Sequence, residues 1–309
     1  MDYTSIRVST LRGDQKIGFN VFLKIGEKWI LYLREGDSFE GDRLKRLKEK
    51  KLKKMFIKTE DEEKYRNYIQ QNIDMAFDDK SGRDIKTRAE VVQGIQQSNV
   101  EEVFEKPENE MAYNIARDSA GKYVQFILNN KQAFPAVMAI ENLDRSLSQH
   151  CVTVSTMAIA LAQRENITDQ KSLQLLTLGA LLHDLGHRDA SYEIARPLES
   201  FTAEDMKLYM NHPKIGAQLA QDKKHFDQLV INIIAQHEEC LDGSGFPQGL
   251  KANSMDPSVL IVATCNQFDR LMSFEGVGRD QVAKKIMLDK VGRYPLPYLQ
   301  KLSEILRGI

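Results

Sequence analysis

The chain has 309 residues, which is long enough for one large domain or two ordinary ones. Its apolar and charged fractions, 42% and 28%, are those of a globular protein and exclude a disordered or fibrous chain. The formal net charge of −1 leaves no whole-chain electrostatic reason to expect a polyanionic partner such as DNA.

Residues 1–105 are predicted to form a small mixed α/β domain. Residues 19–24 and 28–34 are rich in apolar, β-branched and aromatic side chains, and the Gly-Glu pair between them predicts a β-hairpin. Residues 53–58 predict a further strand, and residues 59–62 form a capping-box pattern that opens a helix. No catalytic constellation occurs here, so we expect a regulatory, packing or dimerisation role.

The longest basic run, residues 43–54, alternates lysines with leucines. The favoured interpretation is the solvated face of a helix, and the alternative is a patch for nucleic acid or membrane.

Residues 106–309 are predicted to form an all-helical domain, joined to the first by a polar linker over residues 96–110. Apolar residues recur there at helical spacing without a strand pattern, and residues 202–205 are a second capping box. The helices are predicted over residues 147–163, 172–183, 202–220, 229–239, 257–272, 279–289 and 297–306. The expected fold class is therefore an α+β N-terminal domain followed by an all-α C-terminal helical bundle.

The cysteines and the N-terminus favour a cytoplasmic location. Cys151, Cys240 and Cys265 are odd in number and contain no CxxC pair, which is typical of a reducing compartment without structural disulfides. The N-terminus lacks the apolar segment of a signal peptide, and the longest apolar stretch, residues 175–182, is too short to span a bilayer. We expect no membrane insertion.

The spacing of the histidines predicts a metal site. Four of them fall near the ends or inner faces of successive predicted helices: His150, His183, His212 and His237. The intervals of 25 to 33 residues equal about one helix and one turn, so each helix can deliver a ligand to the same level of the bundle. Asp184 and Glu238 directly follow two of these histidines. One histidine at a helix end is more often a core or capping residue, and only the combined order favours a metal site.

Imidazole and carboxylate groups suit iron, manganese or zinc at catalytic centres. An aspartate such as Asp184 can bridge two ions about 3.5–4 Å apart, which clamps a phosphoryl group for in-line attack by hydroxide.

Three segments resemble signatures of the HD-GYP family, a branch of the HD superfamily of metal-dependent phosphohydrolases. Residues 180–187 (ALLHDLGH) resemble the HD signature, and residues 237–250 (HEECLDGSGFPQGL) resemble the longer HHExxDGxGYPxGL signature. Residues 210–216 (MNHPKIG) match the segment between them. The resemblance covers residues 145–275 and is nearest to an unconventional member that lacks the signature tyrosine. It implies a bundle of HD-domain type that hydrolyses the bacterial second messenger cyclic di-GMP with two or three metal ions, often iron.

The resemblance implies a set of metal ligands: His150, His183, Asp184, His212, His237, Glu238 and Asn266. Asp184 would bridge two divalent ions, which we expect to be iron or alternatively manganese. Glu238 replaces a family histidine, and a carboxylate is a competent ligand for these metals. Asn266 replaces the closing aspartate of the family, and Asp269, one turn later, is the alternative closing ligand.

The resemblance also implies catalytic and substrate-binding residues. The catalytic set is Asp184, His187 and Glu239, and the substrate-binding set is Arg196, His187, Gly245 and Phe246. His187 replaces a family lysine and would contact phosphate or donate a proton, whereas Glu239 would orient ligands or water. Phe246 replaces the signature tyrosine, so a packed aromatic ring is the favoured alternative for it. Arg196 is interpreted as a phosphate contact or, equally, as a solvated loop residue.

Two functions follow from these residues. The first is a phosphodiesterase acting on cyclic di-GMP or its linear product. The second is a catalytically weak or inactive sensor, which keeps the metals and binds a nucleotide or a protein partner. A nucleotidase with another phosphorylated substrate is disfavoured by the GSGFPQGL loop, and a metal-free scaffold has no need of so many histidines and carboxylates.

Overall fold

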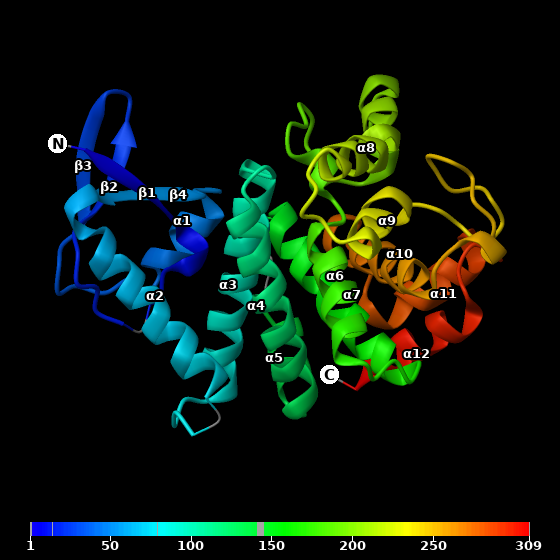
Figure 1. The fold of residues 1–309 in the computed structure, drawn as a ribbon, viewed down its shortest axis with the longest axis horizontal. Coiled ribbons are helices and arrows are strands. Elements are labelled where there is room, and N and C mark those ends of the chain that lie inside the picture. The colour runs from blue at the N-terminus through cyan, green and yellow to red at the C-terminus, as the bar shows by residue number, and fades with distance from the viewer. Residues whose placement is uncertain (1, 14, 79, 141–144, 309) are drawn as a thin grey trace. The chain divides into compact units, whose positions relative to one another are not determined.

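The computed structural model describes residues 2–13, 15–78, 80–140 and 145–308. The chain divides into two compact units between Ser98 and Asn99. Among the described residues, all strands lie in the first unit, and the second is built from helices (Figure 1). No helix in these ranges is both long and apolar enough to cross a membrane.

The first unit contains a four-stranded antiparallel sheet in the order β1-β4-β2-β3. The strands are β1 (Tyr3–Arg7), β2 (Val21–Ile25), β3 (Lys28–Leu33) and β4 (Lys54–Lys58). The predicted hairpin is confirmed, because β2 pairs with β3 and Gly26 between them adopts a positive φ of 59°. The strand predicted over residues 53–58 is confirmed by β4.

Two helices follow the strands in this unit: α1 (Arg43–Glu49) and α2 (Glu62–Phe77). α1 is shorter than the basic run, since the chain leaves helical geometry and Lys51 has a positive φ of 54°. α2 confirms the predicted helix, but the capping box over residues 59–62 is wrong, because the helix begins after Asp61 without a side-chain cap. Inward strand residues such as Ile57 share one hydrophobic core with Tyr68 of α2.

The linker predicted over residues 96–110 is wrong for most of its length. Two helices occupy or border it: α3 (Ile85–Glu105) and α4 (Glu110–Asn129). Val100 and Val103 are buried, so α3 has an apolar face although most of its sequence is polar. The chain leaves the helix only over residues 106–109, where the Asn109 side chain caps the start of α4 by accepting two backbone hydrogen bonds.

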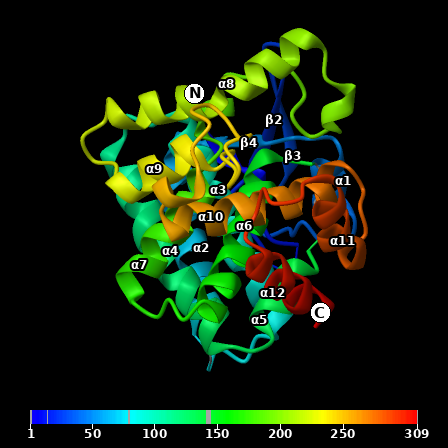
Figure 2. The same cartoon turned by 90° about the vertical axis from the view of Figure 1, so that its right-hand side faces the viewer.

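The second unit is a helical bundle centred on α6 and α7. After α4 its helices are α5 (Ala133–Met138), α6 (Leu147–Arg164), α7 (Gln170–Leu182), α8 (Ala203–Gln221), α9 (Gln228–Gln236), α10 (Pro257–Asp269), α11 (Arg279–Asp289) and α12 (Leu296–Arg307). α7 packs against α4, α6 and α9, and α6 also packs against α10 and α12. Figure 2 views the unit from the side of α10, α11 and α12. Burial on nearly every side explains why α6 and α7 are so apolar in sequence.

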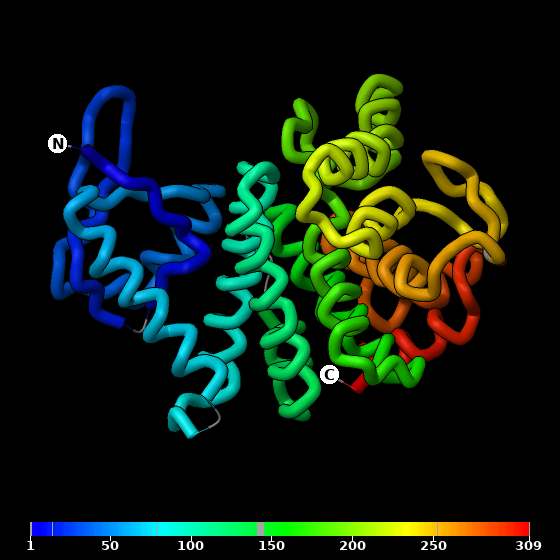
Figure 3. The backbone as a smooth tube through the Cα atoms, in the orientation of Figure 1, coloured from blue at the N-terminus to red at the C-terminus, as the bar shows by residue number. Residues whose placement is uncertain are grey.

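Seven predicted helices of this unit are present, with small shifts at their ends. The capping box of α8 is confirmed, since the side chains of Thr202 and Asp205 each accept a hydrogen bond from the other residue's amide. The helix predicted over residues 257–272 changes character near its end, where α10 continues into a π-helical turn, Arg270–Phe274. Figure 3 shows the long connections that follow α7 and α9, from which several site residues come.

Candidate metal centre

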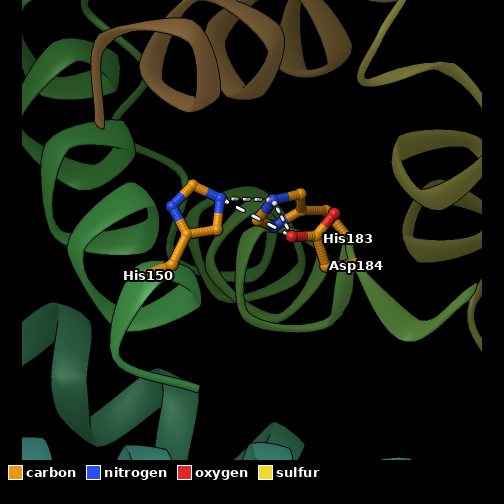
Figure 4. A group of neighbouring side chains, drawn as sticks. All are labelled: His150, His183 and Asp184. Carbon is orange, nitrogen blue, oxygen red and sulfur yellow. Dashed lines mark hydrogen bonds and ion pairs between the residues drawn. The ribbon is translucent and has the colours of Figure 1, made fainter. Parts of the chain in front are cut away.

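Five polar side chains from four parts of the bundle meet in its interior. His150 lies near the start of α6, His183 and Asp184 follow α7, His212 lies within α8, and His237 directly follows α9. Each is at most 5% exposed, although histidine and aspartate are rarely buried without a partner. Figure 4 shows the side chains of His150, His183 and Asp184 pointing toward one another.

Asp184 lies at the centre of this cluster, and its two oxygens face different histidines. Oδ2 is 3.6 Å from Nε2 of His150 and 3.5 Å from Nε2 of His183. Oδ1 is 3.3 Å from Nε2 of His212 and 3.5 Å from Nε2 of His237. One carboxylate therefore serves two pairs of imidazoles, as a ligand bridging two cations does.

Backbone carbonyls set the tautomer of three of these histidines. Nδ1 of His183 lies 2.7 Å from the Ala180 carbonyl, and Nδ1 of His212 lies 2.6 Å from that of Tyr209. Nδ1 of His237 lies 3.0 Å from a carbonyl one turn earlier. A carbonyl only accepts, so each Nδ1 carries the hydrogen, and Nε2 of the neutral ring turns a lone pair toward Asp184. Converging lone pairs beside a carboxylate are the donor set that a divalent metal requires.

The fourth imidazole is held by a carboxylate from α10. Nδ1 of His150 is 2.6 Å from Asp269 Oδ2, and its Nε2 is 3.1 Å from Asn266 Oδ1. Asn266 thus lies on the cluster side of the ring and Asp269 lies behind it. Asp269 fits the role of an outer partner that orients a ligating histidine, which leaves Asn266 as the better placed of the two candidate closing ligands.

Glu238 borders the second pair of imidazoles. Its Oε1 accepts a hydrogen bond from the Tyr209 hydroxyl at 2.6 Å and another from Asn266 Nδ2 at 3.1 Å. Ligand atoms of His212, His237 and Glu238 lie within 4.8 Å of one another, as do those of the triad formed by His150, His183 and Asp184. Asn266 therefore contacts His150 of the first group and Glu238 of the second.

Burial and neighbouring charges set the protonation of the cluster. Burial lowers the pKa of His183 to about 3, which keeps this ring neutral. Burial raises the pKa of Asp184, but the imidazoles around it outweigh that effect and hold its pKa well below the usual value. Burial also lowers the pKa of His150 and His237, yet their hydrogen bonds to Asp269 and Asp184 outweigh it and raise both values. Without metal, these two rings therefore retain protons to higher pH than ordinary histidines.

A pH dependence of metal affinity follows from the raised pKa of His150 and His237. A metal must displace their protons, so we expect the affinity for Mn(II) to fall as pH decreases through these pKa values, by up to about tenfold per pH unit for each displaced proton. Calorimetric titration of chelator-treated protein in buffers of different ionisation enthalpy measures the released protons. A pH-independent affinity with no proton release would contradict the assignment.

His187 lies in the same cluster, where its ring stacks on His212 with centroids 3.8 Å apart. Its Nε2 is 3.8 Å from Asp184 Oδ1, and its Nδ1 is 3.0 Å from the Tyr192 hydroxyl. Burial lowers its pKa well below the usual value, so the ring is neutral near pH 7. This state suits a ligand or a hydrogen-bond partner better than the proton donor expected from the sequence. His187, Asp184 and His212 also form a third group with metal-ligand spacing.

Glu239 stabilises the loop after α9 through hydrogen bonds to backbone amides. The side chain is 1% exposed, and its two oxygens accept hydrogen bonds from the amides of Gln248 and Leu250 at 2.7 and 2.9 Å. Both oxygens are therefore occupied by the loop, and this geometry favours a positioning role over the predicted catalytic one.

The GSGF segment of this loop packs directly on Glu238. The Phe246 amide donates to the Glu238 carbonyl at 3.2 Å, and the Phe246 ring centroid lies 5.8 Å from that of Tyr209. A Cβ on Gly245 would lie 2.6 Å from the Glu238 carbonyl oxygen, so only glycine fits there. Gly245 and Phe246 thus lie beside the second group of ligands.

Arg196 is paired with an acidic side chain, whereas Arg270 lies beside the candidate ligands. The predicted phosphate contact, Arg196, forms an ion pair with Asp205. Arg270 received no role from sequence, yet it is 4% exposed and lies 4.8 Å from the ring centroid of Tyr209, which itself bonds Glu238. In the sequence, Arg270 directly follows Asp269 in a predicted helix, and Tyr209 lies one helical turn before His212.

Known proteins are similar to this chain. A family model described as HD domain matches residues 128–294, more than half of the chain. A solved structure described as Bd1817, a HDG"Y"P protein from Bdellovibrio bacteriovorus, is 59% identical with a TM-score of 0.95, over 99% of this chain and 100% of that one. The chain belongs to the HD-GYP family of HD-domain proteins. In this HD-GYP chain Phe246 stands at the position of the signature tyrosine.

Curated HD-GYP relatives match only part of this chain. Cyclic di-GMP phosphodiesterase PA4108 from Pseudomonas aeruginosa is 26% identical over 158 residues, which are 51% of this chain and 38% of that protein. Cyclic di-GMP phosphodiesterase response regulator RpfG from Xanthomonas campestris is 29% identical over 136 residues, 44% of this chain and 36% of that protein. The chain thus spans little more than a third of the length of these relatives.

Proposed function

We propose that this chain is a metal-dependent phosphodiesterase acting on cyclic di-GMP or a related nucleotide. The observation that carries the proposal is the position of Asp184, whose two oxygens face separate pairs of buried imidazoles. Two cations that share one carboxylate are typical of sites that cleave phosphodiesters. The relatives PA4108 and RpfG, both named as cyclic di-GMP phosphodiesterases, support the substrate class.

The donor set favours two divalent ions, iron or alternatively manganese. Imidazole nitrogens and carboxylate oxygens without thiolate suit these metals. The first ion would be held by His150, His183, Asp184 and Asn266, and the second by Asp184, His212, His237 and Glu238. When bound, the ions would supply positive charge to the phosphodiester and activate water for attack on phosphorus.

The remaining side chains hold the ligands and the nucleotide. Tyr209 and Asn266 orient Glu238 through hydrogen bonds, and Asp269 orients His150. Phe246, on the loop that packs on Glu238, would form an apolar wall for a nucleotide base. His187 would add a neutral hydrogen-bonding group beside Asp184. The first unit would serve as a regulatory or packing domain.

A second candidate function is a metal- and nucleotide-binding sensor with little or no turnover. The observations that favour it are the residues in place of the family's lysine, tyrosine and aspartate. His187 is buried against His212, Phe246 has no hydroxyl group, and Asn266 is a neutral ligand. These changes preserve the ligand cluster and weaken the groups that would act on substrate. Such a sensor would pass its state to a protein partner.

Metal content and turnover measured on one preparation distinguish these functions. The full chain is stripped with a chelator, reloaded with Fe(II) or Mn(II), and incubated with cyclic di-GMP while the linear dinucleotide is quantified by chromatography. The phosphodiesterase proposal predicts about two metals per chain and metal-dependent turnover. Two metals with nucleotide binding but no product would support the sensor, and a chain that takes up no metal would exclude both.

Asp269→Asn should weaken metal binding without removing a ligand. The amide cannot replace the charged partner of His150 Nδ1, and the loss of such an outer carboxylate lowers metal affinity about 10–100-fold. Competition with a coloured chelator measures the affinity for Mn(II). Asp280→Asn, at an exposed position of α11, is the matched control and should leave the affinity unchanged. Equal affinities of the two variants would show that Asp269 does not support the site.

A further inference from the structure

A buried arginine beside the metal centre has no acidic partner. Arg270 opens the π-helical turn after α10 and is 4% exposed. Among the residues that the structure describes, its Nη2 donates only to the backbone carbonyl of Arg196, at 3.4 Å, and its Nε has no hydrogen-bond partner. No carboxylate among the described residues forms an ion pair with it. Arginine remains charged in protein interiors, so this guanidinium is a buried cation without a counter-ion.

Three aromatic rings hold the guanidinium in place. Its central carbon lies 4.8 Å from the ring centroid of Tyr209, 5.6 Å from that of Phe274 and 5.8 Å from that of Phe201. Cation–π contacts offset part of the cost of burial, but they leave the Nε–H group without an acceptor among the described residues. A π-helical turn of this kind is uncommon and occurs frequently at functional sites.

Two of these rings place Arg270 next to the candidate ligands. The Tyr209 hydroxyl donates to Glu238, and the Tyr209 ring lies 5.7 Å from that of His187. The Phe274 ring lies 5.2 Å from that of His150. Tyr209 therefore connects Arg270 to the group that contains Glu238, and Phe274 connects it to the group that contains His150.

The contrast with Arg196 indicates what the missing partner is. Arg196 also contacts Phe201, but its guanidinium is paired with Asp205. Arg270 also contacts the Phe201 ring, but no carboxylate of the described residues forms an ion pair with it. A planar fork with unpaired donors is suited to a phosphate or carboxylate, which it binds through short charge-assisted hydrogen bonds.

We propose that Arg270 binds a phosphate oxygen of the nucleotide, so that it, and not Arg196, is the arginine that recognises substrate at this centre. The identity of the anion as a nucleotide phosphate rests on the proposed function, whereas the existence of an anion site rests on the guanidinium itself. Arg270 would hold the phosphodiester against the ligand cluster and balance its charge, since the guanidinium lies over the ring of Tyr209, whose hydroxyl donates to Glu238.

The test compares anion binding by four variants of the full, metal-loaded chain. Arg270→Gln removes the charge, and Arg270→Lys keeps the charge and loses the fork. Arg196→Gln tests the competing arginine, and Arg117→Gln, whose arginine lies within 3.7 Å of Asp227, is the matched control. Calorimetry measures the affinity for inorganic phosphate and for cyclic di-GMP. Metal per chain and Tm with and without phosphate are measured on the same samples.

We expect Arg270→Gln to weaken binding of both anions by at least about tenfold, and Arg270→Lys by less, at unchanged metal content. Phosphate should raise the Tm of the wild type and of Arg117→Gln but not that of Arg270→Gln, a difference that a merely structural arginine would not produce. Unchanged affinity in Arg270→Gln, or a larger loss in Arg196→Gln, would overturn the assignment.

Failure of the proposed function gives a different result from failure of this inference. Arg270-dependent phosphate binding in a chain that leaves cyclic di-GMP intact would support the anion site and contradict the hydrolysis. Cleavage of cyclic di-GMP by Arg270→Gln with the KM of the wild type would support the hydrolysis and contradict the anion site.

Discussion

Asp184→Ala should leave the chain without a two-metal centre and reduce turnover of cyclic di-GMP at least about 10³-fold, equivalent to about 4 kcal/mol in the barrier. The carboxylate faces two pairs of imidazoles, those of His150, His183, His212 and His237, at 3.3–3.6 Å, so its removal takes a ligand from both ions at once. It also removes the negative charge that offsets two cations in a buried site. Metal per chain, measured by elemental analysis after desalting, should fall well below that of the wild type.

Asp189→Ala is the matched control for this experiment. Asp189 lies five residues after Asp184, but its side chain is 77% exposed and forms an ion pair with Arg188. Its removal should change neither metal content nor turnover. If Asp184→Ala retained two metals and wild-type activity, the bridging role of this carboxylate would be excluded.

Gly186→Ala should disrupt the second metal site through packing alone. A Cβ at this position would overlap the backbone carbonyl of His212 and lie 2.8 Å from the Gly216 amide nitrogen. Both contacts are with the backbone of α8, so the helix must move and carry the His212 ligand with it. We expect a destabilisation of about 2–3 kcal/mol, seen as a fall in Tm of roughly 5–10 °C in metal-free protein. Metal titration should show a loss of affinity for the second ion.

Gly18→Ala separates this effect from the general consequence of adding a methyl group. No described residue lies within 4 Å of a Cβ placed on Gly18, and its φ is not positive. This variant should change Tm by no more than about 2 °C and leave metal binding intact. A Gly186→Ala protein with normal Tm and two metals would show that α8 and the turn after α7 are less tightly packed than the structure indicates.

Periodicity and chain order were sufficient to predict which histidines would meet. His150, His183, His212 and His237 each lie at or near a helix end or inner face, and helical spacing brings such positions to one level of a bundle. The helices themselves were predictable because the apolar stripe of each one is repeated over several turns. The N-terminal hairpin was predictable for a similar local reason, the turn at Gly26 between two apolar runs.

Side-chain partnerships between distant segments were not predictable from the sequence. Asp269 orients His150 from 119 positions away, and no local pattern reports that contact. Arg270 lay in a segment predicted as a continuous helix, whereas the structure has a π-helical turn that begins at this residue. Glu239 sits inside a motif associated with catalysis, yet the loop amides that occupy its oxygens become visible only in three dimensions.

The prediction of a linker over residues 96–110 was wrong because a polar sequence can still form a packed helix. Its sequence is polar, but a helix needs only a narrow apolar stripe to pack, and Val100 and Val103 provide one in α3. Polarity alone therefore did not distinguish a loop from a surface helix.

The most direct test of the two-metal centre is anomalous diffraction from crystals of the full chain loaded with iron or manganese. We predict two anomalous peaks on either side of the Asp184 carboxylate, one beside His150 and His183 and the other beside His212 and His237. A single peak, or peaks that lie outside this cluster of side chains, would contradict a bridged two-metal site.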